Sequence, residues 1–237
     1  MPRPTLFKRI MAGAFLALSL VGCATAPQAQ RPVVALIGDS TVTDEKGWGG
    51  AFADLLDGRA EVHNFAVGGR SAKSYTDENR LPAALAIEPD YVFIQFGHNG
   101  QPGKGPYRET DPEGSYRDYL RDFVAAIRAA GAEPVIVSSL TRRHFDDAGR
   151  IDSTLGPWAD GARAVADELA VPFVDLHAAS VALHDRLGEQ ASAAFDYEPG
   201  DRTHLNEYGA RQIAGLVLDL LGEIDHPLGA PGSVSGD

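Results

Sequence analysis

The chain has 237 residues, a length that favours one compact domain. It carries 21 Lys and Arg against 33 Asp and Glu, a formal net charge of −12 at pH 7. A phosphate backbone would be repelled, so we expect no nucleic-acid partner. The one cysteine, Cys23, excludes an intramolecular disulfide and a metal site built from paired cysteines.

Residues 1–22 have the pattern of a signal peptide. Arg3, Lys8 and Arg9 give a cationic start, and the apolar run 10–21 follows them. As a helix this run would extend only about 18 Å, which is short of the ~30 Å hydrocarbon core of a membrane. The pattern therefore predicts an export signal and not a membrane span.

Residues 20–23 resemble a bacterial lipobox, in which the cysteine becomes the lipid-modified first residue of the mature chain. The resemblance implies lipidation of Cys23, a short tether over 23–31 and a lipid anchor in a membrane. Ala24 after the cysteine favours the outer membrane. The alternative is ordinary cleavage near residues 24–26, which would give a soluble periplasmic or secreted protein.

Five short apolar runs follow in chain order and are predicted to be strands: 33–37, 60–65, 91–96, 134–138 and 171–175. Four of them are nearly continuous in apolar residues, which is typical of parallel strands covered on both faces. Apolar residues recur three and four positions apart over 116–127 and 213–221, which predicts amphipathic helices. Such repeated units form a three-layer α/β/α sandwich, whose ligands bind beyond the carboxyl ends of the strands. The predicted domain is 32–225, followed by a flexible tail over 226–237.

Residues with catalytic chemistry come directly after these strands and before the last helix. A serine hydroxyl is a poor nucleophile until a base takes its proton, and the base needs an acceptor on its other nitrogen. Ser40 follows the first strand, and His204 with Asp201 could supply that pair. The N–H groups of Ser40 and Gly69 and the amide of Asn99 could converge on a developing oxyanion.

Together these segments resemble the SGNH (GDSL) hydrolases and, more narrowly, their rhamnogalacturonan acetylesterase-like branch. The narrower resemblance rests on residues 38–41, 47–49, 64–75, 96–99, 201–204 and 209–210. It implies a flavodoxin-like sheet of five parallel strands in the order 2-1-3-4-5. It also implies a Ser40 nucleophile, a His204 base oriented by Asp201, and no cofactor. The family usually has Asp where this chain has Gly100, so one carboxylate is missing from the cleft wall.

The resemblance implies an exported serine esterase that removes O-acetyl groups from carbohydrate, with rhamnogalacturonan or related pectic fragments as substrate. We expect it to act as a monomer. A first alternative is a lysophospholipase or thioesterase of the same superfamily, which would need an apolar tunnel for a long acyl chain. A second is a surface lipoprotein that binds glycans without turning them over.

Four further residues are candidates for substrate binding: His98, Arg70, Arg142 and Arg143. The alternatives are that His98 shapes its loop, that Arg70 braces Gly69, and that the two adjacent arginines lie in a solvated loop. As a basic cluster those two arginines could also meet the carboxylate of a uronate sugar. We expect no metal site, and the segment 100–115 is the expected flexible wall of the cleft.

Overall fold

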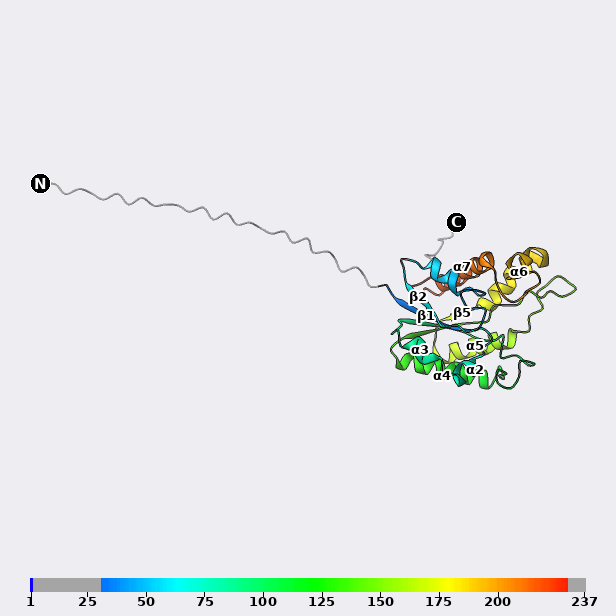
Figure 1. Cartoon of the computed structure of the whole chain (residues 1–237), viewed down its shortest axis with the longest axis horizontal. Helices are drawn as coiled ribbons and strands as arrows, with labels where there is room; N and C mark the ends of the chain where they lie inside the picture. The colour runs from blue at the N-terminus through cyan, green and yellow to red at the C-terminus, as the bar shows by residue number, and fades with distance from the viewer. Residues whose placement is uncertain (2–30, 230–237) are drawn as a thin grey trace. The chain divides into compact units, whose positions relative to one another are not determined.

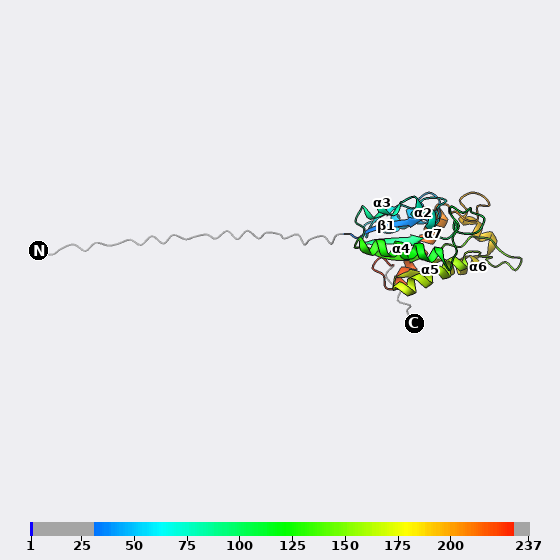
Figure 2. The same ribbon diagram turned by 90° about the horizontal axis from the view of Figure 1, so that it is seen from below.

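A parallel sheet forms the middle layer of the domain (Figures 1 and 2). The computed structural model describes Met1 and residues 31–229. Its strands are β1 (Val33–Gly38), β2 (Glu61–Asn64), β3 (Tyr91–Gln95), β4 (Glu133–Val137) and β5 (Phe173–Val174). Their order is β2-β1-β3-β4-β5 and all neighbours pair in parallel, so the predicted sheet is confirmed.

Helices cover both faces of this sheet (Figure 1). One face carries α1 (Gly49–Leu55), α6 (Leu176–Ser192) and α7 (Glu207–Glu223). The other carries α2 (Ala72–Asp77), α3 (Leu81–Leu85), α4 (Ser115–Ala129) and α5 (Gly156–Leu169). A short 3₁₀ helix, η1 (Ala193–Phe195), follows α6. Both amphipathic patterns seen in the sequence lie inside helices, α4 and α7.

The two hydrophobic cores explain why the strands are apolar throughout. In β1, Val34 and Leu36 belong to the core under α1 and α7, whereas Ala35 and Ile37 belong to the core over α4 and α5. All four side chains are fully buried. Successive side chains of a strand point to opposite faces, so a strand with helices on both sides needs no polar face.

The domain continues past the predicted start of the tail at residue 226. The ring of His226 packs edge-on against Tyr91 with centroids 4.8 Å apart, and Leu228 is 2% exposed. Arg59 donates hydrogen bonds to the carbonyls of Leu228 and Gly229. The prediction of a tail from 226 is therefore wrong for residues 226–229, because these contacts fix them to the sheet.

Several predicted segments lie outside the described residues. These are the signal peptide apart from Met1, Cys23, the tether up to residue 30, and residues 230–237. Within the part that is described, no helix combines the length and the apolar character needed to span a membrane.

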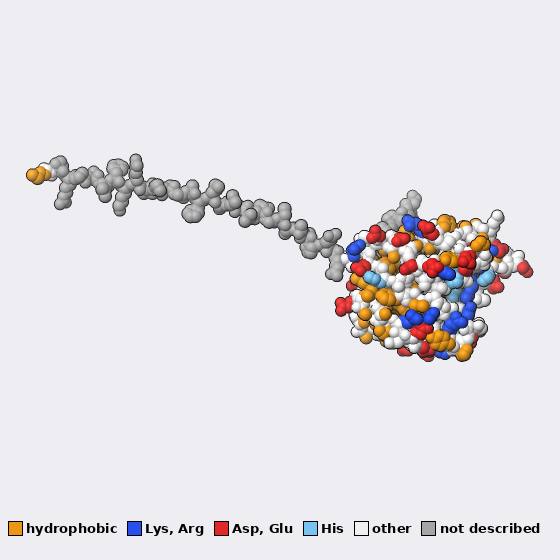
Figure 3. All heavy atoms as spheres, in the orientation of Figure 1, with side chains coloured by type: hydrophobic (Ala, Val, Ile, Leu, Met, Phe, Trp, Pro, Cys, Tyr) orange, Lys and Arg blue, Asp and Glu red, His pale blue; other side chains and the backbone are white. Residues whose placement is uncertain are grey.

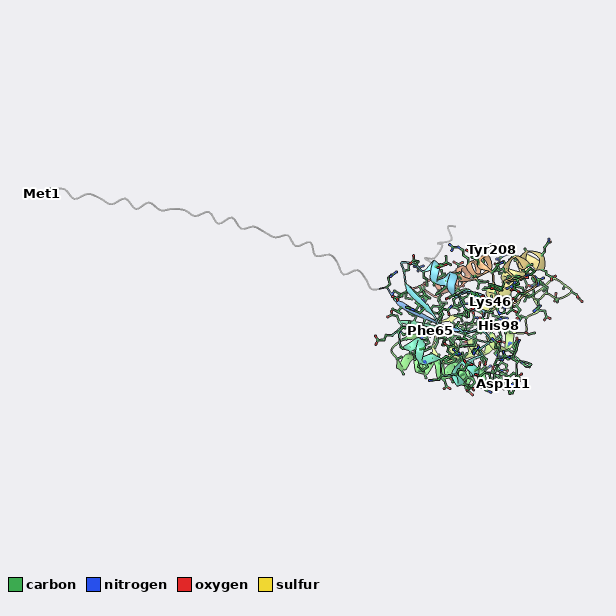
Figure 4. The ribbon with its side chains drawn as sticks, viewed as in Figure 1. Met1, Lys46, Phe65, His98, Asp111 and Tyr208 are labelled. Atoms are coloured by element: carbon green, nitrogen blue, oxygen red, sulfur yellow. The ribbon has the colours of Figure 1, made fainter. Side chains whose placement is uncertain are left out.

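All five strands end at the same edge of the sheet, where the candidate residues gather. Because β1 lies between β2 and β3, the loops after these three strands are neighbours. In Figure 4 the labelled Lys46 and His98, from the loops that follow β1 and β3, lie at this end of the domain.

Candidate active site

Three residues from opposite ends of the domain form a hydrogen-bonded row at the carboxyl edge. The Oγ of Ser40 is 2.9 Å from Nε2 of His204, and Nδ1 of the same ring is 2.8 Å from Oδ2 of Asp201. An ionised carboxylate only accepts hydrogen bonds, so Nδ1 carries the ring proton. Nε2 is then free to accept the proton of Ser40, and this arrangement can activate an alcohol as a nucleophile.

The Asp201 carboxylate is held by its own turn. The backbone N–H groups of Thr203 and His204 both donate to Oδ1 at 3.0 Å, which leaves Oδ2 for the imidazole. Burial alone would raise the pKa of the Asp201 carboxyl, but the two backbone donors and the imidazole outweigh it, and the pKa lies below its usual value. Asp201 therefore stays ionised at neutral pH, as its role beside His204 requires.

A buried row of side chains fixes the turn that contains Ser40. Oδ1 of Asp39 accepts hydrogen bonds from the N–H and the hydroxyl of Thr41, at 2.9 and 2.7 Å. That hydroxyl accepts from Nε2 of Gln95 at 2.7 Å, and Oε1 of Gln95 accepts from the indole of Trp48 at 2.9 Å. Trp48 is fully buried, so it packs inside the domain and offers no face to a sugar.

Gln95 is the member of this row that lies outside the motifs noted in the sequence. The sequence does contain a feature that indicates its importance: Gln95 is a polar residue at the end of the otherwise apolar strand β3, and it is buried. A buried amide must find hydrogen-bond partners, and here both of its polar atoms have one.

His98 and Asp39 form a buried pair beneath the same turn. Nδ1 of His98 lies 3.4 Å from Oδ2 of Asp39, and the side chains are 3% and 0% exposed. Burial would raise the pKa of the Asp39 carboxyl, but the electrostatic effect of His98 and the hydrogen bonds of Thr41 bring it below its usual value. This position beneath the turn agrees with the loop-shaping role given as the alternative to substrate binding.

The loop after β2 brings a second backbone N–H close to Ser40. The N–H of Val67 donates to the carbonyl of Gly38 at 2.9 Å, and a Cβ built on Gly68 would lie 3.6 Å from that of Ser40. Gly69 has φ +78°, a backbone conformation that residues with a side chain rarely adopt. Among the described residues, the N–H groups of Ser40 and Gly69 have no hydrogen-bond partner, so both can donate to an oxyanion.

Asn99 adds a third donor from the loop after β3. Its Nδ2 donates to the carbonyl of Arg70 at 3.1 Å, which sets the orientation of the amide. An amide nitrogen has two protons, so the second remains for a ligand. Ser40, Gly69 and Asn99 thus come from three neighbouring loops, and their donors can serve the same negative charge.

The guanidinium of Arg70 makes hydrogen bonds to residues near it in the chain. Its Nε donates to both carboxylate oxygens of Glu78, and Nη1 donates to the carbonyl of Gly68 at 3.0 Å. Tyr107 donates from its hydroxyl to the same Glu78 at 2.7 Å. These contacts agree with the bracing role given as the alternative to substrate binding.

Gly100 has no room for the aspartate that the family usually has. A Cβ at this position would lie 2.5 Å from Oγ1 of Thr110 and 3.0 Å from Nε1 of Trp158. The N–H of Thr110 donates to the carbonyl of Gly100, and the indole of Trp158 donates to the Thr110 hydroxyl. Thr110, from the segment expected as the cleft wall, thus occupies space that a side chain at position 100 would need.

The two adjacent arginines after β4 have different surroundings. Arg142 is half-buried and donates to Oε1 of Gln101 at 2.5 Å and to the carbonyl of His98 at 3.4 Å. Arg143 is 0% exposed. The prediction that Arg143 binds substrate is wrong, because its guanidinium points into the protein and does not reach solvent.

Basic side chains and histidines gather at the carboxyl-edge end of the domain, at the right of the view in Figure 3. Across residues 31–229, no three or more His, Cys, Asp and Glu side chains come together in a way that could hold a metal ion.

Residues 36–212 match the model of the GDSL-like lipase/acylhydrolase family. Two relatives are named as rhamnogalacturonan acetylesterases. RhgT of Bacillus subtilis (strain 168) is 38% identical over 221 residues, 84% of this chain and 94% of the relative. The other, from Emericella nidulans, is 30% identical over 223 residues, 85% of this chain and 89% of the relative.

Solved structures share the fold at lower identity. The YxiM protein of Bacillus subtilis is 24% identical with a TM-score of 0.73, and the match covers 83% of this chain but only 57% of that one. An acetylxylan esterase from Geobacillus stearothermophilus is 18% identical with a TM-score of 0.64, and the match covers 85% and 97% of the two chains.

Proposed function

The chain belongs to the GDSL-like lipase/acylhydrolase family, and we propose that it is a serine esterase that removes acetyl groups from carbohydrate. The observation that carries this proposal is the row from Ser40 through His204 to Asp201, with 2.9 and 2.8 Å between partners. The substrate class follows from relatives named as rhamnogalacturonan acetylesterases at 38 and 30% identity. Rhamnogalacturonan or a related pectic fragment is therefore the proposed substrate.

The first stage of the reaction transfers the acetyl group to the enzyme. His204 takes the proton of Ser40 while Oγ attacks the ester carbonyl. The carbonyl oxygen becomes negative and receives hydrogen bonds from the N–H groups of Ser40 and Gly69 and from the Asn99 amide. When the C–O bond to the sugar breaks, the imidazolium of His204 gives its proton to the leaving sugar oxygen.

The second stage returns the enzyme to its starting state. His204 takes a proton from water as the water oxygen attacks the acetyl carbonyl on Ser40. The second tetrahedral intermediate uses the same three donors, and its collapse returns the proton to Oγ and releases acetate. Asp201 stays ionised throughout and stabilises the imidazolium in both stages.

Acetate release from a panel of acetylated polysaccharides tests the proposal. We expect release from acetylated rhamnogalacturonan by the wild-type chain, and a fall of at least about 10⁴-fold in Ser40→Ala because the nucleophile is lost. Undiminished release by Ser40→Ala would reject the assignment. Labelling of the wild-type chain but not of Ser40→Ala by a fluorophosphonate would exclude a glycan-binding protein without catalysis.

An aryl ester series from acetate to octanoate separates an acetylesterase from a long-chain acyl hydrolase. We expect rates to fall as the acyl chain grows, since His204 and the proposed oxyanion donor Asn99 give the site polar walls and no apolar tunnel is needed for an acetyl group. A rate that rises with chain length would favour a lysophospholipase or thioesterase.

Export and lipidation of Cys23 belong to the same proposal. The support is the sequence of residues 1–23 alone: a cationic start, an apolar run and a lipobox-like end. Mass spectrometry of the mature protein tests it, and a mature chain that begins after Cys23 without lipid would reject it.

Arg142 is the arginine we propose for contact with a uronate carboxylate. It is half-buried beside the loop of His98, and two of its five N–H donors have partners. We expect Arg142→Ala to lose activity on acetylated glycans that carry uronates and to keep it on neutral ones. Arg121→Ala, on the surface of α4, is the matched control. Equal losses on both classes would contradict the proposal.

A further inference from the structure

The buried guanidinium of Arg143 contacts the segment that carries both proton-transfer residues. Its Nη2 donates to the carbonyls of Asp201 and His204, at 2.8 and 2.6 Å. Its backbone N–H donates to the carbonyl of Arg202 at 2.8 Å. One residue of the loop after β4 therefore holds three carbonyls of the segment 201–204.

This segment has no regular secondary structure to hold it. Residues 197–206 lie between η1 and the start of α7, with only an isolated bridge, Asp196 to Leu205, at their base. On the other side, the N–H of Leu205 donates to the carbonyl of Lys46 at 2.9 Å, in the loop that follows Ser40. Arg143 and Lys46 thus fix the segment from two sides.

The charge of Arg143 is compensated inside the protein. Its Nε donates to Oδ1 of Asp196 at 3.1 Å, and Oδ2 of Asp196 accepts from Arg202 at 3.1 Å. Asp196 is 5% exposed, so the pair is shielded from water and salt. A buried charge is retained only where a partner and hydrogen bonds offset its desolvation. Here those partners are Asp196 and the carbonyls of the segment 201–204.

We propose that Arg143 is a positioning residue that holds His204 and Asp201 in line with Ser40. The inference rests on the proposed esterase function and adds a residue that does not touch substrate. The planar guanidinium donates in several fixed directions, so that it serves the carboxylate of Asp196 through Nε and two backbone carbonyls through Nη2. Lysine has a single nitrogen and cannot serve both Asp196 and the carbonyls in the same way.

Kinetics of Arg143→Lys and Arg143→Met on an aryl acetate test the proposal in the full chain. A small displacement of the base costs about 10²-fold in rate, so we expect kcat to fall about 10²-fold in Arg143→Met and about tenfold in Arg143→Lys. KM should change less than about twofold in both, because the side chain does not reach the substrate. Arg121→Met, which removes a surface arginine of α4, controls for a general loss of charge and should keep full activity.

The rate of Ser40 labelling by a fluorophosphonate gives a second measurement that needs no glycan. We expect the labelling rate to fall in the same order as kcat, while circular dichroism shows that each variant is folded. If wild-type chain is labelled but releases no acetate from any glycan, the proposed substrate fails and the Arg143 comparison still stands.

Two results would overturn the role of Arg143. One is a folded Arg143→Met with kcat and labelling rate within about twofold of wild type. The other is a loss confined to KM, which would indicate a substrate contact. If Arg143→Met does not fold, Arg143→Lys decides by the same criteria. A lower kcat at unchanged KM supports the proposal, and an unchanged kcat overturns it.

Discussion

In the proposed reaction, Asn99 supplies a hydrogen bond that the substrate needs only after Ser40 has attacked. Its Nδ2 is already oriented by the carbonyl of Arg70, so the donor is in place before the reaction begins. Interactions made only in the transition state raise kcat without tightening substrate binding. Loss of the Asn99 amide should therefore lower kcat and leave KM nearly unchanged.

For Asn99→Ala we expect kcat to fall by about 10² to 10³, the usual loss for one oxyanion donor, with KM changed little. The measurement is steady-state hydrolysis of an aryl acetate at neutral pH. Asn79→Ala, on the exposed turn between α2 and α3, is the control and should keep wild-type activity. A rise in KM with kcat intact would show that the amide binds the ground state.

A single methyl group added at Gly100 should lower the stability of the domain. A Cβ there meets Thr110 and Trp158, so Gly100→Ala must push the two apart, and overpacking of this kind costs about 1–3 kcal/mol. Urea unfolding measures the loss. The same substitution at Gly215, in α7 with open space around it, should instead stabilise by about 0.5–1 kcal/mol because Ala is the better helix former. Equal effects at the two sites would contradict this account.

The inward direction of the Arg143 side chain could not be predicted from the sequence, for a specific reason. Arg142 and Arg143 are adjacent and chemically identical, and nothing in one sequence says which of them a loop turns inward. His98 presented the same ambiguity. By contrast, Ser40, Asp201 and His204 could be proposed together, because a known family pattern fixes their spacing and their places at strand ends.

At the scale of elements, α7 begins three residues after His204, and its N-cap residue Asn206 connects it to η1. Oδ1 of Asn206 accepts from the N–H of Gly209 at 2.9 Å, and Nδ2 donates to the carbonyl of Ala194 at 2.9 Å. The first contact is an N-cap, which satisfies a helix donor that has no partner within the helix.

Substitutions of Asn206 separate these two contacts. Asn206→Ala removes both, and we expect it to lower the free energy of unfolding by about 1–2 kcal/mol. Asn206→Ser keeps a capping oxygen and loses the bond to Ala194, so it should lose less. Urea midpoints of the two variants give the comparison. A larger loss in Asn206→Ser than in Asn206→Ala would show that the cap contributes little.

Strand positions could be predicted from the sequence better than strand ends. The apolar run 171–175 predicts a strand of five residues, yet β5 has two. Pro172 has no N–H for a ladder, and Asp175 caps α6 by accepting from the N–H of Ala178. A proline and a helix cap thus limit β5 to part of the predicted run. The hydrophobic pattern alone does not show where such a strand begins and ends.

At the scale of the whole molecule, His184 links stability to pH. It is fully buried, its Nδ1 is 3.0 Å from the hydroxyl of Ser192, and burial with the nearby charge of Arg143 lowers its pKa from 6.5 to about 4. Below pH 6.5 the unfolded chain takes up a proton that the folded chain does not bind until about pH 4. The contribution of His184 to the free energy of unfolding is therefore fully present above pH 6.5 and is lost as the pH falls toward 4.

We expect this linkage to cost up to about 3 kcal/mol between neutral pH and pH 4. The measurement is the free energy of unfolding in urea at pH 7.5, 5.5 and 4.5, for wild type and His184→Gln. The variant cannot titrate in this range, so its stability should fall less over the same interval. Parallel curves for the two proteins would contradict the assignment to His184.

The chain enters β1 at Val33 and leaves the described domain at Gly229, close to Arg59 and far along the strands from Ser40. Both ends therefore emerge at the amino edge of the sheet, opposite the carboxyl edge that holds the candidate site (Figure 1). A bead, a resin or a fusion partner joined directly to residue 31 or residue 229 would therefore lie at the edge opposite the candidate site. Even a long polymer could then approach an immobilised form of the enzyme without meeting its support.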